Sequence, residues 1–262
     1  MTAPVHALAG WKRILGEIRR APGLGLFSDF DGTLVRLRKH PRQVRLPGRM
    51  RERLMALSRQ VRVVGIVSGR RIADLRRRAK VPHVWYAGAH GFYLMTPGNR
   101  EISLLTRGER ATMRRVRRSL AGALAGLRGV RLEPKEATLA VHYRAASSKT
   151  AARARQVIEG VIEEHEGVSL MAGKKVWELL PNSHTDKWTA ISYILRHSRK
   201  GPAGGRILPI FLGDDVTDER VFRKMEGISV AVGKKHKTAA RYYLRSPAEV
   251  AKFLDRVRQA AG

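Results

Sequence analysis

The sequence has 262 residues, of which 43% are hydrophobic and 6% aromatic, a composition typical of a globular chain with an ample core. Its 52 lysines and arginines against 22 acidic residues give a formal net charge of +30, so the surface attracts anions such as phosphorylated metabolites and nucleic acid. The absence of cysteine excludes disulfides, thiolate metal sites and cysteine catalysis.

No segment is long and apolar enough to span a bilayer, and the first 20 residues lack the basic start and apolar run of a signal peptide. We therefore expect a cytoplasmic protein without a membrane partner. The arginines gather in helix-like runs such as "RRIADLRRRAK" and "MRRVRRSLAG". These runs are either solvated helix faces or a surface for nucleic acid. Aromatic residues are not interleaved with them, which makes nucleic acid the secondary interpretation.

Residues 24–29 and 61–67 are short, almost continuous apolar runs. This pattern predicts strands of a parallel sheet that are buried on both faces. Between them, apolar residues recur at helical spacing over residues 49–60.

The middle of the chain has the order of an α+β domain with antiparallel strands. We expect strands at 101–105, 130–133 and 138–143, helices over 107–127 and 148–165, and a hairpin over 168–180 that turns at Ala172 and Gly173. These elements predict an inserted domain over residues 97–184. It divides a core domain into residues 1–96 and 185–262.

After the insertion, a helix over 186–198 precedes apolar strands at 207–213 and 228–232. The last helix is expected to begin with Ser246 as N-cap, Pro247 at the first position and Glu249 completing a capping box. Strands alternating with helices predict an α/β fold, with a doubly wound, mostly parallel Rossmann-like core and an inserted α+β cap domain.

Polar residues follow three of the predicted core strands. The three strand ends are Asp29-Phe30-Asp31-Gly32-Thr33, Ser68-Gly69-Arg70 and Asp214-Asp215-Val216-Thr217-Asp218-Glu219. In open α/β sheets, ligands bind beyond the carboxyl ends of the strands. We therefore expect these side chains to converge on one crevice.

Several carboxylates in one crevice need a cation, and an all-oxygen set suits Mg²⁺. The predicted set is Asp29, Asp31, Asp214, Asp215 and Asp218. Magnesium recruits phosphate, and Ser68 and Lys187 can supply a hydroxyl and a positive charge for its oxygens. Because the chain has no Walker-type glycine loop, a carboxylate nucleophile remains. Asp29 attacks phosphorus to form an aspartyl-phosphate, while Asp31 protonates the leaving alcohol and then activates water.

The segments "DFDGTL", "VSGR", Lys187 and "GDDVTDE" resemble, in this order, the four signature segments of the haloacid dehalogenase-like superfamily. The chain is more closely similar to the trehalose-6-phosphate phosphatase family. The similar pieces are "DFDGTLVRLRKHP", "YAGAHGFYL", "LAVHYR", "GKKVWELLP" and "GDDVTDERVF". This resemblance covers roughly residues 20–255 and leaves the N-terminal helix unaccounted for. It implies a small cap domain between the second and third signatures.

The resemblance also implies a role for each matching residue. Asp29 becomes nucleophile and metal ligand, Asp31 becomes acid/base and gives the metal only its backbone carbonyl, and Asp214 becomes the distal ligand with Asp215 and Asp218 nearby through water. Lys187 and Ser68 hold phosphate, Lys175 and Glu178 reach sugar hydroxyls, and Arg70, His90, His142 and Arg144 line the crevice.

Other interpretations of the sugar-binding residues stay open. His142 and Arg144 alternate with apolar neighbours and could form the solvated face of a strand. His90 could cap a glycine-rich turn. Lys175 and Glu178 could form a cross-strand ion pair, and the alternation that separates Trp177 from Glu178 favours Trp177 as a core residue.

The leading hypothesis is a magnesium-dependent phosphatase of a sugar phosphate, with trehalose 6-phosphate as substrate. Two departures concern the substrate: Leu180 stands where related sequences generally have arginine, and Trp188 where a glycine commonly follows the signature lysine. They leave sucrose, glucosylglycerol and mannosylglycerate phosphates as alternative substrates. A non-catalytic basic protein that binds anions or nucleic acid is the alternative of a different class. The sequence gives no indication of oligomeric state.

Overall fold

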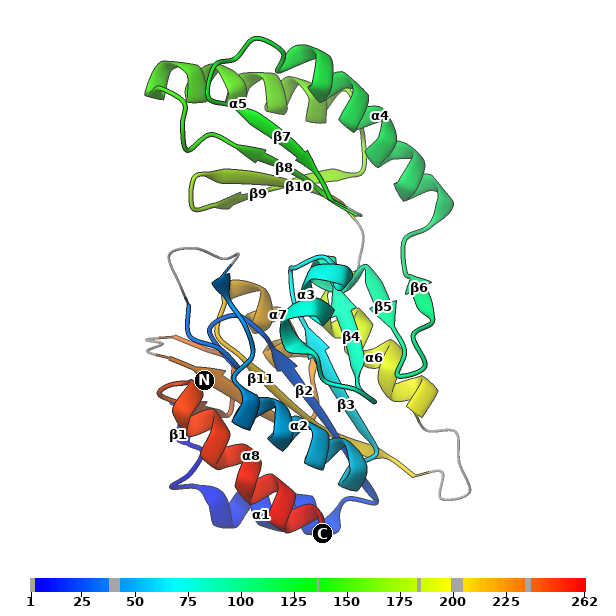
Figure 1. Ribbon diagram of the computed structural model, residues 1–262, viewed down its shortest axis with the longest axis vertical. Helices are drawn as coiled ribbons and strands as arrows, with labels where there is room; N and C mark the ends of the chain where they lie inside the picture. The colour runs from blue at the N-terminus through cyan, green and yellow to red at the C-terminus, as the bar shows by residue number, and fades with distance from the viewer. Residues whose placement is uncertain (1–2, 38–42, 136, 183–184, 199–204, 234–236) are drawn as a thin grey trace. The chain divides into compact units, whose positions relative to one another are not determined.

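The computed structural model describes residues 3–37, 43–135, 137–182, 185–198, 205–233 and 237–262. The chain divides into two compact units (Figure 1). The larger unit is Met1–Ser103 with Thr185–Gly262, and the smaller unit is Leu104–His184.

The larger unit is built on a sheet that has nine strands in the described residues, in the order β1-β13-β12-β11-β2-β3-β4-β5-β6. Neighbouring strands are parallel except at β4–β5 and β5–β6. The strands are β1 Val5–His6, β2 Gly23–Asp29, β3 Val63–Val67, β4 Trp85–Gly88, β5 Tyr93–Met95, β6 Glu101–Ser103, β11 Ile207–Gly213, β12 Ile228–Val232 and β13 Tyr242–Leu244. The predicted mostly parallel α/β core is confirmed.

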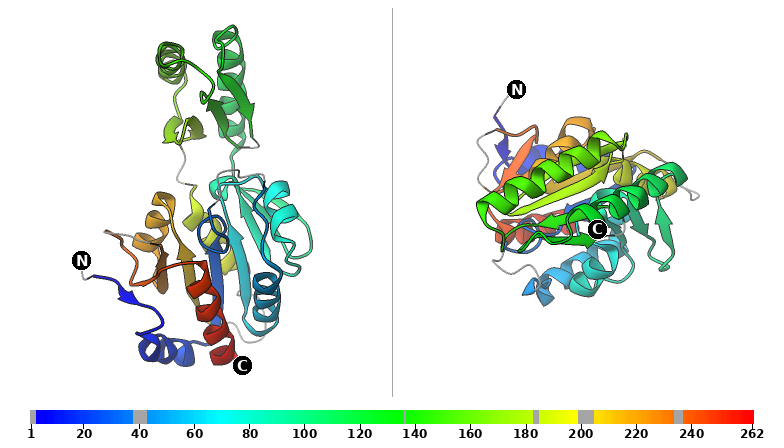
Figure 2. Two further views of the ribbon diagram at one scale, coloured as in Figure 1. Left: turned by 60° about the vertical axis from the view of Figure 1, so that its left-hand side comes forward. Right: turned by 90° about the horizontal axis from the view of Figure 1, so that it is seen from above.

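Helices cover both faces of this sheet, as the views of Figure 2 show. They are α1 Trp11–Arg20, α2 Gly48–Gln60, α3 Ile72–Ala79, α6 Lys187–Ser198, α7 Val216–Lys224 and α8 Pro247–Ala261. On one face, α1, α2, α3 and α8 share a hydrophobic cluster with Leu26 of β2 and Ile66 of β3. On the other face, Phe222 of α7 packs on Phe211 of β11, with ring centroids 5.6 Å apart. None of the helices in the described ranges could cross a membrane.

Alternation along β2 decides on which face its last residue lies. Leu26 faces the cluster that includes α2 and α8, so Phe27 points to the opposite face. Asp29, two residues after Phe27, shares that face. Leu195 of α6 packs there against Gly25. The first strand therefore directs its terminal carboxylate toward the layer that contains α6 and α7.

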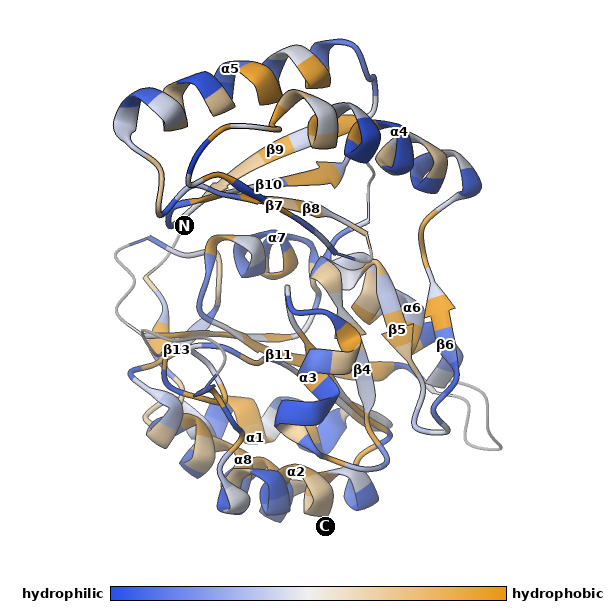
Figure 3. Cartoon of the chain, turned by 45° about the horizontal axis from the view of Figure 1, so that its top comes forward, coloured by the Kyte–Doolittle hydropathy of each residue, from blue (hydrophilic) through white to orange (hydrophobic). Residues whose placement is uncertain are grey.

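The smaller unit has a four-stranded antiparallel sheet in the order β7-β8-β10-β9. Its elements are α4 Arg107–Ala123, β7 Arg131–Pro134, β8 Leu139–His142, α5 Ser148–Glu163, β9 Val168–Gly173 and β10 Val176–Pro181. One hydrophobic cluster joins Val116 of α4, Ile158 of α5, and Trp177 and Leu179 of β10. Along both helices, hydrophobic residues alternate with hydrophilic ones (Figure 3). Trp177 is therefore a core residue, and its ring stacks on that of Tyr143 at 3.9 Å.

Two local expectations about the inserted segment differ from the structure. Residues 97–103 belong to the larger unit, because β6 pairs with β5 in the core sheet. The hairpin turns at Lys174 and Lys175, whereas the sequence suggested Ala172 and Gly173. Gly173 pairs with Val176 in the strand register, and Lys175 takes the positive φ of 62° that closes the turn.

The expected capping box of α8 does not form. Glu249 instead accepts hydrogen bonds from the backbone N–H of Arg245, at 2.8 Å, and from the ring of His6, at 2.8 Å. The side chain of Ser246 makes no cap hydrogen bond. Glu249 therefore ties the start of α8 to β1 instead of closing its own helix.

The N-terminal segment is an integral part of the larger unit. Val5 and His6 of β1 pair with β13. Trp11 of α1 contacts Phe253 of α8 edge-to-face, with ring centroids 5.8 Å apart. Arg241, just before β13, forms a bidentate ion pair with Glu17 of α1, at 2.6 and 2.8 Å. These contacts place α1 in the same packed layer as α8.

We expect Phe253→Ala to lower the free energy of unfolding by about 3–5 kcal/mol, because it leaves a cavity at a fully buried position that also contacts Trp11. Urea denaturation followed by circular dichroism would measure the change. Leu37→Ala is the matched control, since Leu37 is 71% exposed and its loss should cost less than about 0.5 kcal/mol. Equal losses in the two variants would contradict the assigned packing of α8.

Candidate active site

The centre of the site is the ammonium of Lys187, the first residue of α6. Its Nζ donates to Oδ1 of Asp29 and to Oδ1 of Asp218, each at 2.7 Å. All three side chains are buried, with exposures of 2%, 6% and 0% in that order. Asp29 and Asp218 lie 158 and 31 positions from Lys187 in the sequence, and its ammonium joins them.

Asp214 approaches the same point from the end of β11, which lies next to β2 in the sheet. Its Oδ1 accepts a hydrogen bond from the hydroxyl of Thr33 at 2.9 Å. Gly32 makes this approach possible, because a Cβ there would lie 2.0 Å from Oδ2 of Asp214, and its φ of +85° is unfavourable for other residues. The Asp-Gly-Thr sequence thus holds the carboxylate that arrives from the neighbouring strand.

Asp215 and Asp218 form a reciprocal capping box at the start of α7. Oδ1 of Asp215 accepts from the backbone N–H groups of Thr217 and Asp218, while Oδ2 of Asp218 accepts from those of Asp214 and Asp215. A Cβ at Gly213 would lie 2.3 Å from the Asp218 carboxyl carbon, so glycine is required there. Asp218 therefore fixes the loop that carries Asp214.

The electrostatics of the cluster show too few positive charges for its carboxylates. Burial raises the pKa of Asp29 well above its usual value despite the attraction of Lys187, and the charges of Asp218 and Asp214 raise it further. Burial likewise raises the pKa of Asp214 to about 7, against the hydrogen bond from Thr33. Burial alone would lower the pKa of Lys187, but the nearby carboxylates outweigh it and raise that pKa. One ammonium cannot neutralise this group.

These residues suit a hard divalent cation. Carboxylate oxygens of Asp29, Asp214 and Asp218 lie within 4.8 Å of one another. The donors are all oxygens, which is the chemistry that Mg²⁺ and Ca²⁺ prefer. The raised pKa values of Asp29 and Asp214 indicate that a cation would also relieve repulsion within the cluster.

The carboxylate of Asp31 lies outside this triad. Arg70 binds it bidentately, with Nε at 2.5 Å from Oδ2 and Nη2 at 2.6 Å from Oδ1. A third nitrogen of Arg70, Nη1, donates to Asp74 of α3 at 3.0 Å. Arg70, which the sequence suggested as a substrate contact, is thus engaged by two carboxylates.

Ser68 follows β3, the strand next to β2, and His90 follows β4, the strand beyond it. The sheet register pairs Asp29 with Val67, and the buried Ser68 follows at once. The backbone N–H of His90 donates to the carbonyl of Ser68 at 3.1 Å, and the His90 ring covers Gly69 so closely that a Cβ there would meet it at 2.6 Å. His90 itself has a φ of 59° within the turn Ala89–Gly91. The turn holds the imidazole against the Ser68-Gly69 segment.

The remaining predicted residues lie in the smaller unit. Oε1 of Glu178 accepts hydrogen bonds from Nζ of Lys135 and Oγ1 of Thr138, both at 2.8 Å. Lys175, the other partner suggested for Glu178, sits in the β9–β10 turn with its ammonium 5.7 Å from the centre of the Tyr143 ring.

His142 and Arg144 also have partners within the smaller unit. The ring of His142 lies 2.7 Å from Oε2 of Glu133, and Arg144 donates to the carbonyl of Lys174 at 3.3 Å. Their hydrogen bonds fit the alternative interpretation of a polar strand face.

Two neighbours of the site residues, Asp74 and Lys135, were not predicted from the sequence. Thr33 was expected at the strand end, but its bond to Asp214 was not. Asp74 lies four residues after Arg70, a spacing that brings side chains together on a helix. Lys135 is 43 residues from Glu178 and carries no sequence signal.

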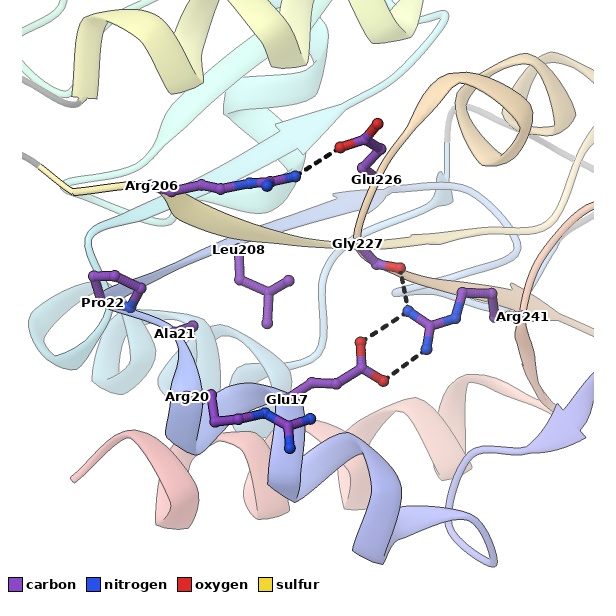
Figure 4. A pocket seen from close by; sticks show the side chains of 9 residues that line it. All are labelled: Glu17, Arg20, Ala21, Pro22, Arg206, Leu208, Glu226, Gly227 and Arg241. Atoms are coloured by element: carbon purple, nitrogen blue, oxygen red, sulfur yellow. Dashed lines mark hydrogen bonds and ion pairs between the residues drawn. The ribbon is translucent and has the colours of Figure 1, made fainter.

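A cavity of about 350 Å³ lies at the amino ends of β2 and β11, the ends away from the carboxylate cluster (Figure 4). It is lined by Glu17, Arg20, Ala21, Pro22, Arg206, Leu208, Glu226, Gly227 and Arg241. Two of its three arginines are paired, Arg241 with Glu17 and Arg206 with Glu226. None of the predicted site residues lines it, so it is separate from the carboxylate cluster.

The family model of trehalose-phosphatase matches residues 27–248. The chain belongs to the trehalose-phosphatase family. It is 32% identical over 246 residues to a trehalose-phosphate phosphatase of Mycobacterium ulcerans (strain Agy99), covering 90% of this chain and 62% of that protein. It is also 32% identical over 250 residues to one of Mycobacterium tuberculosis (strain H37Rv), covering 92% of this chain. The chain thus spans 62% of the length of these curated relatives.

Solved structures are similar over almost the whole chain. The C-terminal domain of Candida albicans trehalose-6-phosphate phosphatase has a TM-score of 0.76 at 21% identity and covers 98% of both chains. Aspergillus fumigatus trehalose-6-phosphate phosphatase has a TM-score of 0.71 at 26% identity, with coverage of 99% of this chain and 100% of that one. The haloacid dehalogenase-like fold expected from the signature segments is confirmed.

In protein freed of divalent ions with a chelator, stability should depend on the protonation of Asp214. Its pKa is raised to about 7 in the folded state, above the value near 3.9 of an exposed carboxyl. The stabilisation is therefore fully present below about pH 4 and is lost as the pH rises through 7. We expect the melting temperature of the wild type to fall over this range relative to that of Asp214→Asn. A constant difference between the two proteins from pH 4 to 7.5 would contradict the raised pKa.

Proposed function

We propose that the chain is a magnesium-dependent phosphatase that hydrolyses trehalose 6-phosphate to trehalose and phosphate. The observation that carries this proposal is the buried group of Asp29, Asp214 and Asp218 around Lys187 at the carboxyl ends of β2 and β11. Membership of the trehalose-phosphatase family supports the reaction class, and the names of the relatives support the substrate.

Asp29 is the nucleophile in this proposal. Lys187 holds its Oδ1, which leaves Oδ2 to attack phosphorus. The bond between phosphorus and the sugar oxygen breaks as the new P–O bond forms, and Asp31 gives its proton to that oxygen. Water then attacks the phosphoryl group, Asp31 takes a proton from the water, and the bond from phosphorus to Asp29 breaks. Ser68 and Lys187 are the groups assigned to the phosphoryl oxygens.

The metal in this proposal is Mg²⁺, held by the carboxylates of Asp29 and Asp214 and by the backbone carbonyl of Asp31. Asp218 and Asp215 support this set from nearby: Asp218 by its bonds to Lys187 and to the Asp214 backbone, Asp215 through the helix cap. When bound, the ion supplies positive charge that offsets repulsion between the attacking carboxylate and the phosphate dianion.

Glu178 is the residue we assign to the sugar hydroxyls. Lys135 and Thr138 both donate to its Oε1, which restrains the orientation of the carboxylate, and a carboxylate is an acceptor suited to the hydroxyls of a polyol. Lys175, His142, Arg144, Arg70 and His90 are the other candidates for contacts with the substrate. Leu180 and Trp188 favour a second candidate function, hydrolysis of another glycosyl phosphate. The expectation of a cytoplasmic location and the secondary interpretation of a nucleic-acid partner stay predictions.

A substrate panel tests the proposed function. We expect phosphate release in the presence of Mg²⁺ to be fastest, by kcat/KM, for trehalose 6-phosphate among the phosphates of trehalose, sucrose, glucosylglycerol and mannosylglycerate. Asp29→Asn should lose roughly a thousandfold or more of this activity with an unchanged circular dichroism spectrum. Equal or better turnover of another member would overturn the substrate assignment. Activity that survives in Asp29→Asn would overturn covalent catalysis through this residue.

Replacing Glu178 should separate sugar recognition from phosphoryl transfer. We expect Glu178→Gln to lower kcat/KM for trehalose 6-phosphate about tenfold or more, because loss of one charged hydrogen-bond partner costs at least about 1.5 kcal/mol. Hydrolysis of p-nitrophenyl phosphate should change less than about threefold. Glu159→Gln on α5 is the matched control, since Glu159 pairs with the exposed Arg155. Equal losses on both substrates would remove Glu178 from sugar recognition.

A further inference from the structure

Asp74 has no part in the chemistry proposed above, yet its carboxylate is connected to the acid/base residue through one side chain. We propose that Asp74 is a positioning residue that fixes the guanidinium of Arg70 and, through it, the carboxylate of Asp31. This inference rests on the proposed role of Asp31. It concerns residues of the larger unit alone.

The contact between Arg70 and Asp31 fixes the plane of the carboxylate. Two nitrogens of the guanidinium meet the two carboxylate oxygens at 2.5 and 2.6 Å, the fork-to-fork arrangement in which both groups are coplanar. A single hydrogen bond would leave the carboxylate free to rotate about its bond to Cβ. The bidentate pair instead sets the direction in which Asp31 presents its oxygens.

Asp74 determines where the guanidinium itself lies. It accepts from Nη1, the nitrogen that Asp31 does not use, at 3.0 Å. Because the guanidinium is rigid and planar, holding Nη1 on one side fixes the positions of Nε and Nη2 on the other. The side chain of Arg70 is only 14% exposed, so water has limited access to replace this contact.

Asp74 is in turn held firmly by α3. Arg78, one turn further along the helix, donates from Nε to Oδ2 of Asp74 at 2.6 Å, and Arg77 donates from Nη2 to Oδ1 at 2.5 Å. Arg78 is itself buried and donates from Nη1 to the carbonyl of Val44 at 2.9 Å. Burial would raise the pKa of Asp74, but hydrogen bonds from Arg78 and Arg70 outweigh it and hold the pKa at about 2. The anchor therefore stays charged at physiological pH.

Hydrogen bonds also hold the backbone of Arg70, so the position of its guanidinium depends on the conformation of the side chain. The N–H of Arg70 donates to the hydroxyl of Ser68 at 3.2 Å, and its carbonyl accepts from the N–H of Ala89 at 2.7 Å. A Cβ at Gly88 would lie 2.9 Å from that carbonyl oxygen. The second signature segment thus anchors the main chain, and Asp74 completes the arrangement by anchoring the guanidinium.

A purely structural role for Asp74 predicts something different. In that case the residue would only neutralise the buried Arg78, and its removal would lower stability and all activities together. A positioning role predicts a loss that depends on how much the reaction needs Asp31. The first half-reaction of an aryl phosphate with a good leaving group needs no proton from Asp31, whereas release of the sugar alcohol does.

The first experiment compares these two substrates in Asp74→Asn, which keeps the shape of the side chain. We expect kcat for trehalose 6-phosphate to fall about tenfold or more with little change in KM. The pre-steady-state burst of dinitrophenol from 2,4-dinitrophenyl phosphate should change less than about threefold. Asp74→Glu, which keeps the charge, should recover part of the loss. Equal losses in the two reactions would overturn the positioning role.

Two control variants separate stability from positioning. Phe253→Ala should lower the melting temperature, because it leaves a cavity in the core beneath α8, yet leave the ratio of the two rates unchanged while Asp74 still holds Arg70. Asp255→Asn removes a carboxylate that pairs with Arg53 on another helix and should leave the ratio unchanged as well. A shift of the ratio in Asp255→Asn would show that the ratio of the two rates does not report on Asp31, and this result would overturn the inference.

A double-mutant cycle with Asp31 completes the test. If Asp74 acts through Asp31, Asp74→Asn should change kcat for trehalose 6-phosphate less than about twofold in an Asp31→Asn background. A full tenfold loss in that background would overturn the inference and leave the proposed function standing. Wild-type turnover in Asp31→Asn alone would instead overturn the acid/base role, and the inference with it.

Discussion

The buried ammonium of Lys187 between Asp29 and Asp218 is the interaction on which the rest of the site depends. Isolated charges are expensive to bury, and here several carboxylates share one permanent counter-charge. The carboxylates come together because strands β2 and β11 are neighbours, so the aspartates at their ends meet at one edge of the sheet. The raised pKa of Asp214 and the all-oxygen donor set both follow from this excess of negative charge.

Glycine residues make such close approach possible. Without a side chain at Gly32, Asp214 comes within a distance that any Cβ would block, and Gly213 gives Asp218 the same access to the loop. Hydrogen bonds then fix the position of Asp214. Thr33 binds its carboxylate, and the capping box of α7 holds its backbone. Asp29 and Asp214 have their hydrogen-bond partners in other elements, Lys187 of α6 and Thr33 after β2.

Much of this could be predicted from the sequence. Apolar runs indicated β2, β3, β11 and β12, and the motifs that follow them gave the aspartates of the cluster. The partners of Asp31 and Glu178 could not be predicted, because Arg70 and Lys135 are 39 and 43 residues away and such pairing is set by tertiary packing. The predicted turn of the β9–β10 hairpin was misplaced for a related reason. The register of the two strands depends on which face is buried, and Trp177 and Leu179 determine that face.

The contacts of α1 and α8 extend the hydrophobic core beyond the span that the family model matches. The matched span, residues 27–248, begins inside β2 and ends at the start of α8. Outside it lie Ile14 and Ile18 of α1 and Phe253 and Val257 of α8, all in the main hydrophobic cluster. A fragment trimmed to the matched span would expose the sheet face that these side chains cover. The span that the family model matches is therefore narrower than the packed core to which it belongs.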